Sequence, residues 1–232
     1  MSVRRRGGEA VEDRSWDAVS ADFLQSAVPW RTFRWYKGQR HYSGTYWSAT
    51  MRDHVIYESR LELTRLLFAD FDPAVRYIGA QPFLLKAELE GRVCKHIPDY
   101  LLVTEQGLVV VDVKPFHRLS KPEVAFIFGW TRRVVEARGW QYEVWSEPPE
   151  VELENIRFLA GYRRDWMFSL ELLDEIQGAW VDGVALGQAA RSLPGRPESQ
   201  VRSAIHHLIW LHRLVVPLDR PLSSSQILRW AT

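Results

Sequence analysis

Two apolar runs rich in β-branched residues lie on either side of a short turn near the middle of the chain. Residues 96–103 read HIPDYLLV, residues 108–115 read LVVVDVKP, and the Thr-Glu-Gln-Gly segment between them ends in glycine. This pattern predicts a β-hairpin. Closing the hairpin on a two-residue loop pairs Val103 with Leu108, and this pairing sets the register of every other residue along the two strands.

The predicted register places Asp99 opposite Asp112, with their side-chain carbons about 5 Å apart. Side chains alternate along a strand, so Lys114 is expected on the same face as Asp112. Two facing carboxylates repel each other unless a cation lies between them. Mg²⁺, with Mn²⁺ as its usual substitute, prefers such oxygen ligands. A metal held there would polarise a phosphate and lower the pKa of a bound water.

Lys114 would orient or deprotonate the water that attacks the phosphate, so the pattern favours metal-dependent hydrolysis of phosphodiesters. The alternative is an ordinary edge hairpin, in which Asp99 is a turn carboxylate and Lys114 protects the sheet edge from pairing with another strand.

A helix with an apolar face is predicted upstream, over residues 52–68, and residues 70–73 end it. Glu58 and Glu62 would lie one turn apart on the same side of this helix. Two interpretations are open: a solvated acidic stripe paired with Arg65, or a glutamate that adds a metal ligand over the hairpin. Glu62 is flanked by leucines, so we expect it to be partly buried, and a buried carboxylate needs a partner.

The pattern around these elements predicts the rest of an α/β domain. Residues 75–89 form a strand pair or one bent strand, residues 121–138 a helix, and residues 142–145 a short strand. Because a helix separates residues 108–114 from residues 142–145, these two strands should be parallel. The predicted fold class is therefore a mixed sheet flanked by helices.

A second unit is predicted from residue 151. Residues 155–159 should dock on the first domain, and three helices follow over residues 167–176, 184–192 and 197–211. A hairpin that starts at residues 214–218 and returns through Leu222 completes the pattern of a winged helix.

Basic residues cluster around the third of these helices, with only Glu198 opposing them in the sequence: Arg191, Arg196, Arg202, His206 and Arg213. Such a unit either contacts DNA, with Arg196 and Arg202 as candidate contacts, or docks on a partner protein, and both readings are open. His206 and His207 lack further metal-type partners and are expected at the surface or at an interface.

The N-terminal region is polar and is expected to be loose, apart from a short helix near residues 16–24. Between residues 30 and 50 there is no carboxylate, and four basic residues lie among aromatic ones: Arg31, Arg34, Lys37 and Arg40. Basic residues between aromatic ones suit phosphates and stacked bases, or an arm whose aromatic rings pack on the domain. The predicted organisation is an arm over 1–43, a nuclease domain over 44–150 and a winged-helix-like domain over 151–232.

The composition limits the classes of protein to which this chain can belong. The formal net charge is +1, so overall basicity gives no argument for nucleic acid, and Cys94 is the only cysteine, which excludes an internal disulfide. No apolar run approaches the roughly 18 residues of a membrane span, and no secretory signal is recognisable at the start. We expect a cytoplasmic protein in a reducing setting.

These residues resemble a known family. Glu62 on a helix, Pro98-Asp99, and Asp112-Val113-Lys114 resemble the signature of PD-(D/E)XK nucleases, which have restriction-endonuclease-like folds. The resemblance is closer still to the TnsA-type endonuclease subunits of heteromeric transposases. It is carried by five segments that together span about residues 44–145: 44–50, 57–63, 81–83, 96–101 and 111–115.

The resemblance implies a Mg²⁺-dependent endonuclease that cuts double-stranded DNA at the 5′ ends of a transposon. Its partners would be an integrase-like transposase subunit and an ATPase regulator that contacts the C-terminal part. Glu62, Asp99 and Asp112 would be metal ligands, together with the carbonyl of Val113, and Lys114 would assist the attacking water. Some members have glutamine where this chain has Asp112. The alternatives are a stand-alone restriction or repair nuclease and a catalytically inactive DNA-binding or adaptor protein with the same fold.

Overall fold

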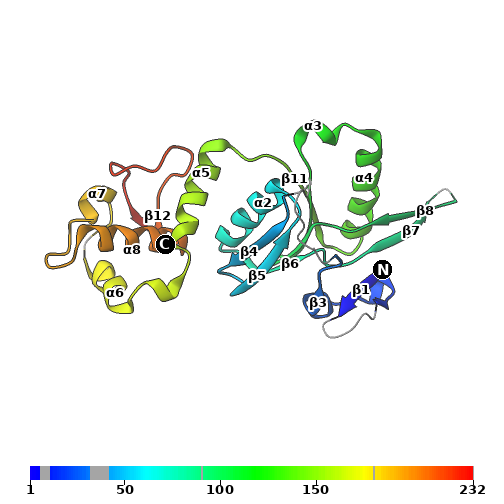
Figure 1. Cartoon of the computed structure of the whole chain (residues 1–232), viewed down its shortest axis with the longest axis horizontal. Helices are drawn as coiled ribbons and strands as arrows, with labels where there is room; N and C mark the ends of the chain where they lie inside the picture. The colour runs from blue at the N-terminus through cyan, green and yellow to red at the C-terminus, as the bar shows by residue number, and fades with distance from the viewer. Residues whose placement is uncertain (6–10, 32–41, 90, 180, 232) are drawn as a thin grey trace. The chain divides into compact units, whose positions relative to one another are not determined.

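The computed structural model describes residues 1–5, 11–31, 42–89, 91–179 and 181–231. The chain divides into two compact units, residues 1–147 and 148–232, which are described separately (Figure 1). In the ranges just given, no helix combines the length and the apolar character needed to cross a membrane. The chain is a mixed α/β protein, as its pattern predicts.

A four-stranded sheet is the centre of the first unit. Its order is β11-β10-β9-β6, and β9 pairs antiparallel with both of its neighbours while β10 and β11 are parallel. Val103 lies opposite Leu108 across the two-residue loop, so the predicted register of the hairpin is confirmed. The strands are β6 (Val75–Ala80), β9 (Tyr100–Thr104), β10 (Gly107–Val113) and β11 (Gln141–Trp145).

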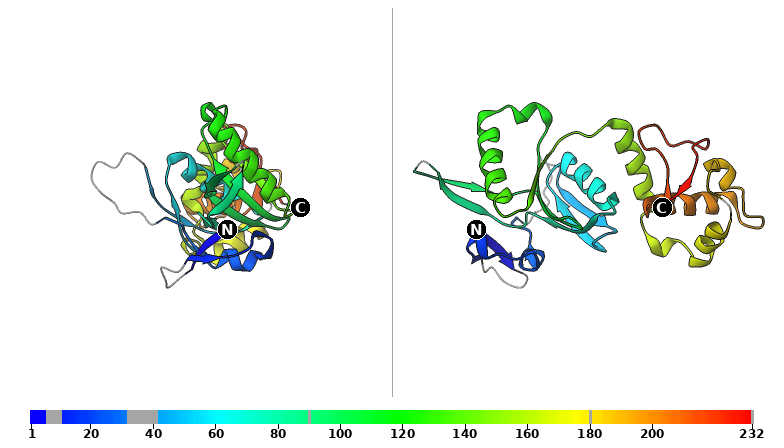
Figure 2. Two further views of the ribbon diagram at one scale, coloured as in Figure 1. Left: turned by 90° about the vertical axis from the view of Figure 1, so that its right-hand side faces the viewer. Right: turned by 180° about the vertical axis from the view of Figure 1, so that it is seen from behind.

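Two helices cover opposite faces of this sheet (Figures 1 and 2). On α2 (Arg60–Phe71), Arg65 forms an ion pair with Glu143 of β11 at 2.8 Å. On α4 (Pro122–Glu136), the guanidinium of Arg132 lies over the ring of Tyr142, the preceding residue of β11. Neighbouring residues of a strand point to opposite faces, so these contacts place the helices on either side. The short helix α3 (Phe116–Leu119) connects β10 to α4.

The predicted helix over residues 52–68 begins later than expected, so that part of the prediction is wrong. Residues before it form β5 (Asp53–Tyr57), which pairs antiparallel with β4 (Gly44–Ser48). The run His-Val-Ile-Tyr is rich in β-branched and aromatic residues and suits a strand. Ser59 then caps α2, because its hydroxyl accepts a hydrogen bond from the backbone N–H of Glu62. Glu58 therefore lies just before the helix, and does not share a helical face with Glu62.

The described part of the N-terminal region, residues 1–5 and 11–28, is not loose, in contrast to the prediction. It forms a small sheet in the order β2-β1-β3 and a short helix, α1, after a 3₁₀ turn at residues 16–18. Val3, Val19 and Leu24 are almost completely buried in one cluster with Phe83 and Trp130. A few apolar side chains in a polar segment are enough to anchor it on a core formed by other elements. The elements are β1 (Ser2–Arg5), β2 (Val11–Asp13), α1 (Ala21–Gln25) and β3 (Ala27–Val28).

A separate hairpin connects β6 to β9 along the chain. β7 (Leu85–Leu89) and β8 (Arg92–His96) pair antiparallel, and the last residue of β8, His96, stands opposite Leu85 at the base of the hairpin (Figure 2). Residues 75–89 thus supply two strands of different sheets. The base of this hairpin brings His96 close to the carboxyl end of β10.

The second unit contains the three predicted helices. They are α6 (Leu170–Gly178), α7 (Leu186–Ala189) and α8 (Glu198–Trp210), and α5 (Glu150–Leu159) precedes them together with 3₁₀ turns at 160–162 and 165–167. The strand that returns to β12 (Leu214–Val215) is β13 (Arg229–Trp230) and not a segment near Leu222, because Leu214 pairs with Trp230.

The prediction that residues 155–159 dock on the first domain stays a prediction, and the hydrogen bonds of Asn155 on α5 show its role within the second unit. The side-chain amide of Asn155 donates hydrogen bonds to the carbonyls of Leu218 and Arg220, at 2.9 and 2.8 Å. Its carbonyl oxygen accepts from the N–H of Leu222. These three bonds all lie within the second unit, so Asn155 fixes the irregular loop that precedes β13.

The two histidines of α8 are buried, which corrects their predicted surface location. His206 is 6% exposed, and its ring contacts the rings of Phe158 and Tyr162. The ring of His207 stacks on that of Phe168 and makes a hydrogen bond to the carbonyl oxygen of Tyr162 at 2.7 Å. Both side chains therefore belong to the core of the second unit.

The burial of His206 predicts a loss of stability in acid. Burial, with the nearby Arg202, lowers the pKa of His206 from 6.5 to about 4. The folded protein binds a proton at His206 less readily than the unfolded chain does. The contribution of neutral His206 to the free energy of unfolding is therefore fully present above pH 6.5 and is lost as the pH falls towards 4. The loss is about 3 kcal/mol, at about 1.4 kcal/mol for each pH unit. Urea unfolding at pH 7 and pH 4.5 should show less pH dependence in His206→Gln than in wild type. His117→Gln, at an exposed histidine of α3, should match wild type, and equal dependence in all three chains would contradict the assignment.

Candidate active site

The five residues predicted to form a metal and catalytic site line one cavity of the first unit. This cavity has a volume of about 690 Å³, and Glu62, Asp99, Asp112, Val113 and Lys114 all border it. They come from the first turn of α2, the segment before β9 and the end of β10. The sheet and its covering helix α2 bring together residues that lie far apart in the sequence.

Asp112 is the most enclosed member of the site. It is 1% exposed, and the Nε2 atom of His96 lies 2.9 and 2.8 Å from its two carboxylate oxygens. A carboxylate only accepts hydrogen bonds, so Nε2 of His96 carries the proton and donates it. The hydroxyl of Tyr142 donates a further hydrogen bond to Oδ2. These donors hold the Asp112 side chain in one orientation.

Asp99 lies across the hairpin end from Asp112. Its backbone N–H donates to the carbonyl of Val111, and its Oδ2 accepts from the N–H of Val113 at 2.7 Å. Burial raises the pKa of Asp99 well above its ordinary value, and the charges of Asp112 and Glu62 raise it further. The amide of Val113 and the charge of Lys114 oppose this rise in pKa. The surroundings of Asp99 therefore disfavour its anionic form, because they hold more negative charge than the nearby cation offsets.

Glu62 has a structural role that the sequence interpretation did not consider. Its carboxylate accepts from the backbone N–H of Glu58 at 2.7 Å and from the hydroxyl of Ser59 at 2.9 Å, while the Glu62 N–H donates to Ser59. This is a variant of the capping box in which Glu62 reaches the N–H of the residue before the cap, and the spacing Ser59-x-x-Glu62 could have identified it. Burial raises the pKa of Glu62, and these hydrogen bonds lower it. Each carboxylate oxygen retains a lone pair, so the cap does not exclude a further contact.

Gln81 connects the walls of the cavity, and it is a residue to which the sequence interpretation gave no role. Its backbone has a left-handed φ of 46°, which is costly for a residue with a side chain. Its N–H donates to the carbonyl of Asp99 at 2.8 Å, and its side chain bridges Glu58 and the backbone N–H of Arg31. This conformation therefore holds the segment that carries Asp99.

Lys114 extends the positive side of the cavity. Its backbone is fixed by two hydrogen bonds, from its N–H to the carbonyl of Trp145 and from the Ser146 hydroxyl to its carbonyl. Its ammonium lies 5.9 Å from the centre of the Phe128 ring and lowers the pKa of both Asp99 and Glu62. The lysine thus faces the carboxylates from a rigid backbone, as the alternation of the strand predicts.

The donor set is suited to a hard divalent cation, but the side chains do not form a ready coordination sphere. Three carboxylates and the Val113 carbonyl are oxygen ligands of the kind that Mg²⁺ takes. Among the described residues, however, no group of three or more His, Cys, Asp or Glu side chains is arranged to hold a metal ion. The chemistry of the donors fits the ion. Binding would require side-chain movements that bring the carboxylate oxygens around one ion, and the lone pairs left on the Asp112 oxygens allow this while His96 and Tyr142 hold the side chain.

The candidate DNA-binding residues fall into three groups. Arg31 borders the cavity, but its guanidinium lies 3.2 Å from Glu58. Arg34, Lys37 and Arg40 lie outside the described residues. In the second unit, Arg196 pairs with Glu175 at 2.5 Å and with Glu171 at 3.3 Å, and Arg202 pairs with Glu198.

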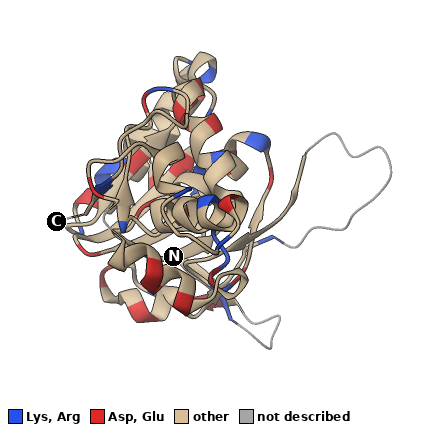
Figure 3. Ribbon diagram, turned by 90° about the vertical axis from the view of Figure 1, so that its left-hand side faces the viewer, with Lys and Arg blue, Asp and Glu red and all other residues tan. Residues whose placement is uncertain are grey.

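The expectation that only Glu198 opposes the basic residues of α8 is therefore wrong, because α6 supplies two further carboxylates. Figure 3 shows acidic and basic residues interspersed along the elements.

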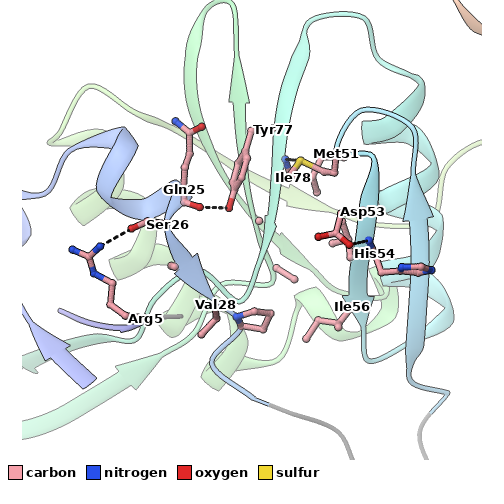
Figure 4. A pocket seen from close by; sticks show the side chains of 15 residues that line it. Arg5, Gln25, Ser26, Val28, Met51, Asp53, His54, Ile56, Tyr77 and Ile78 are labelled. Atoms are coloured by element: carbon pink, nitrogen blue, oxygen red, sulfur yellow. Dashed lines mark hydrogen bonds between the residues drawn. The ribbon is translucent and has the colours of Figure 1, made fainter. Parts of the chain in front are cut away.

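A second cavity of about 530 Å³ contains none of the predicted site residues (Figure 4). It lies where β3, β5 and β6 meet, and its polar groups have partners. The hydroxyl of Tyr77 donates to the carbonyl of Gln25, Arg5 donates to Ser26, and the N–H of Ile78 contacts the sulfur of Met51. The first of these contacts joins the N-terminal segment to β6, and the third joins β6 to the turn after β4, so they have a structural role.

No protein-family model matches the chain, and a search of curated proteins finds no significant match. The case for a function therefore depends on the residues of the cavity and on the physical arguments above.

Proposed function

We propose that this protein is a metal-dependent DNA endonuclease that hydrolyses phosphodiester bonds. The observation that carries the proposal is the convergence of Glu62, Asp99, Asp112 and Lys114 on one cavity. Burial strongly raises the pKa of Asp99 there, and the repulsion of two nearby carboxylates raises it further. A cation would relieve this repulsion, and Mg²⁺ or Mn²⁺ is the ion for which these oxygen ligands are suited.

Each residue of the cavity has a role in the proposed reaction. Asp99 and Asp112 bind the cation with the Val113 carbonyl, and Glu62 contributes from the first turn of α2. When bound, the ion polarises the phosphate and lowers the pKa of a water. Lys114 is positioned by Trp145 and Ser146 and orients that water or offsets charge on the phosphate. His96 and Tyr142 hold the Asp112 carboxylate in place.

At the level of family, we infer a restriction-endonuclease-like fold and a TnsA-like endonuclease subunit of a heteromeric transposase. A helix carrying Glu62, an antiparallel hairpin carrying Asp99 and Asp112, and a parallel strand after a crossover helix support this inference. The expected substrate is the 5′ end of a transposon in double-stranded DNA, with an integrase-like transposase as partner.

For the second unit we infer a winged-helix-like domain that docks on a protein, such as the ATPase regulator, rather than on DNA. Most of α8, from Val201 to Trp210, is buried, whereas a helix that reads DNA must expose a face. The arginines at its start, Arg196 and Arg202, are engaged by carboxylates of the same unit. These two observations favour the protein-docking reading that the sequence left open.

The test is metal dependence, measured on the purified chain by two readouts. Isothermal titration with Mn²⁺ should give a binding isotherm, and supercoiled plasmid should be nicked in Mg²⁺ or Mn²⁺ but not after removal of the ion with EDTA. If nicking needs the transposase subunit, the same dependence should appear in the reconstituted pair. The absence of both Mn²⁺ binding and metal-dependent nicking under these conditions would refute the proposal.

A second candidate function is a catalytically inactive DNA-binding or adaptor protein that keeps the nuclease fold. One observation favours it: both oxygens of Asp112 are engaged by His96 and Tyr142, and the described residues contain no ready group of three metal ligands. In such a protein the Asp112 carboxylate would be a buried structural anchor. Retained DNA binding together with an absence of heat in the Mn²⁺ titration would select this alternative.

A further inference from the structure

The segment that follows Lys114, which is itself a lining residue of the cavity, presents an unusual surface. Phe116, the first residue of α3, is 75% exposed, which is the highest value among the aromatic side chains that the structure describes. Exposing a large aromatic ring to water is unfavourable by about 25 cal/mol for each Å² of apolar surface. A single exposed ring is ordinary by itself, so the inference depends on the charges of the same segment.

The backbone beneath Phe116 is firmly held. Its N–H donates to the carboxylate of Glu147 at 2.9 Å, and this hydrogen bond lowers the pKa of Glu147. Pro115 restricts the preceding residue, and its carbonyl accepts from the N–H of Arg118 at 2.8 Å. The ring is therefore presented from a rigid position two residues beyond Lys114.

The same segment is positively charged. Between Asp112 and Glu123 there is no carboxylate, while Lys114, Arg118 and Lys121 are basic. Arg118 and Lys121 are exposed, and in the described part of the chain neither has an ion-pair partner. This distinguishes them from Arg31, Arg196 and Arg202, which carboxylates of the chain already engage. Exposed, unpaired cations beside an exposed ring have the charge and shape to bind a polyanion with flat bases.

We propose that residues 116–121 are a DNA-binding segment of this protein. Arg118 and Lys121 bind backbone phosphates, and Phe116 packs against a base next to the phosphate in the cavity. The proposal rests on the proposed nuclease function, since it identifies how that site would hold its substrate. Phosphate contacts position the duplex, and an apolar wedge at a base step opens it locally. A duplex bound by residues 116–121 would lie across the cavity that Lys114 lines.

The test measures DNA affinity and is independent of cleavage. Fluorescence anisotropy with a labelled duplex in EDTA should be recorded over a range of salt concentrations. The double variant Arg118→Gln/Lys121→Gln should bind more than tenfold more weakly at low salt. Its plot of log affinity against log salt should also be less steep by about 2, because two phosphate contacts are lost. Phe116→Ala should lower affinity about tenfold with an unchanged slope, and Phe116→Trp should restore it.

Matched controls separate local from general effects. Arg76→Gln/Lys86→Gln removes the same charge from exposed residues of β6 and β7, and Trp166→Ala removes an exposed ring from the second unit; both should leave affinity within about twofold. A salt slope that falls equally in both double variants would overturn the proposal while leaving the nuclease function intact. A wild-type chain that binds no duplex and cuts none in Mg²⁺ would overturn both.

Discussion

The Asp112→Ala variant should lose metal-dependent cleavage of DNA by about 10³-fold or more while it still binds the duplex. Asp112 is the carboxylate that the fold positions most firmly, through His96 on one side and Tyr142 on the other. Removing it deletes one of the proposed ligands and leaves Asp99 without the charge that, with Glu62, raises its pKa. Nicking of supercoiled plasmid in Mn²⁺ measures the first effect, and anisotropy in EDTA measures DNA binding.

Two further variants make this result specific to the charge of Asp112. Asp112→Asn keeps an oxygen that accepts the hydrogen bond of Tyr142, so it should fold like wild type and should still lose cleavage. Asp17→Asn, at an exposed aspartate of the N-terminal segment, should cleave at the wild-type rate. Cleavage by Asp112→Asn at the wild-type rate would show that this carboxylate binds no catalytic ion, and the inactive alternative would then be preferred.

The Asp70→Ala variant should be destabilised by about 3 kcal/mol or more, without any direct effect on the candidate site. Asp70 lies near the end of α2 and is buried. Its carboxylate accepts four hydrogen bonds, two from hydroxyls and two from backbone N–H groups, at distances between 2.5 and 3.0 Å. The donors are Tyr46, Ser48, Ala49 and Thr50. Alanine would leave buried donors without a partner, which costs more than the bonds themselves contribute.

Urea unfolding followed by the fluorescence of tryptophans measures this loss of stability. Asp72→Ala is the matched control, since Asp72 is exposed two residues further on and its carboxylate accepts one hydrogen bond, from the N–H of Ala74. It should cost about 1 kcal/mol. Equal losses in the two variants would mean that Asp70 does not organise the turn after β4. Replacing Asp70 should therefore lower stability, because four donors satisfy its carboxylate. Replacing Asp112 should instead lower cleavage, because its carboxylate borders a cavity with two other carboxylates.

Local sequence signals were sufficient to predict the strand pairing at the centre of the first unit. The two-residue loop at Glu105 and Gln106 and the β-branched runs around it determine the hairpin register, because pairing close in sequence is set by the turn. The length of the helix after Lys114 determined that β11 is parallel to β10. The common face of Asp112 and Lys114 follows from alternation along the strand. A close reading could also have found the capping box at Ser59 and Glu62.

Other features were decided only by the tertiary structure, because they depend on partners distant in the sequence. His96 meets Asp112 through the base of a separate hairpin, and Gln81 reaches both Glu58 and Asp99 from a strained backbone. The arginines at the start of α8 have the charge of a DNA-binding surface, but the packing of α6 supplies Glu171 and Glu175 to Arg196.

By itself, the sequence determined which side chains are candidates for the proposed chemistry and which strands bring Asp99, Asp112 and Lys114 together, because neighbouring residues and short turns set these features. Only the tertiary structure decided which charged side chains form ion pairs and which stay exposed without a partner, as Arg118 and Lys121 do among the described residues. The reason is that an ion pair forms where the fold brings two opposite charges within reach.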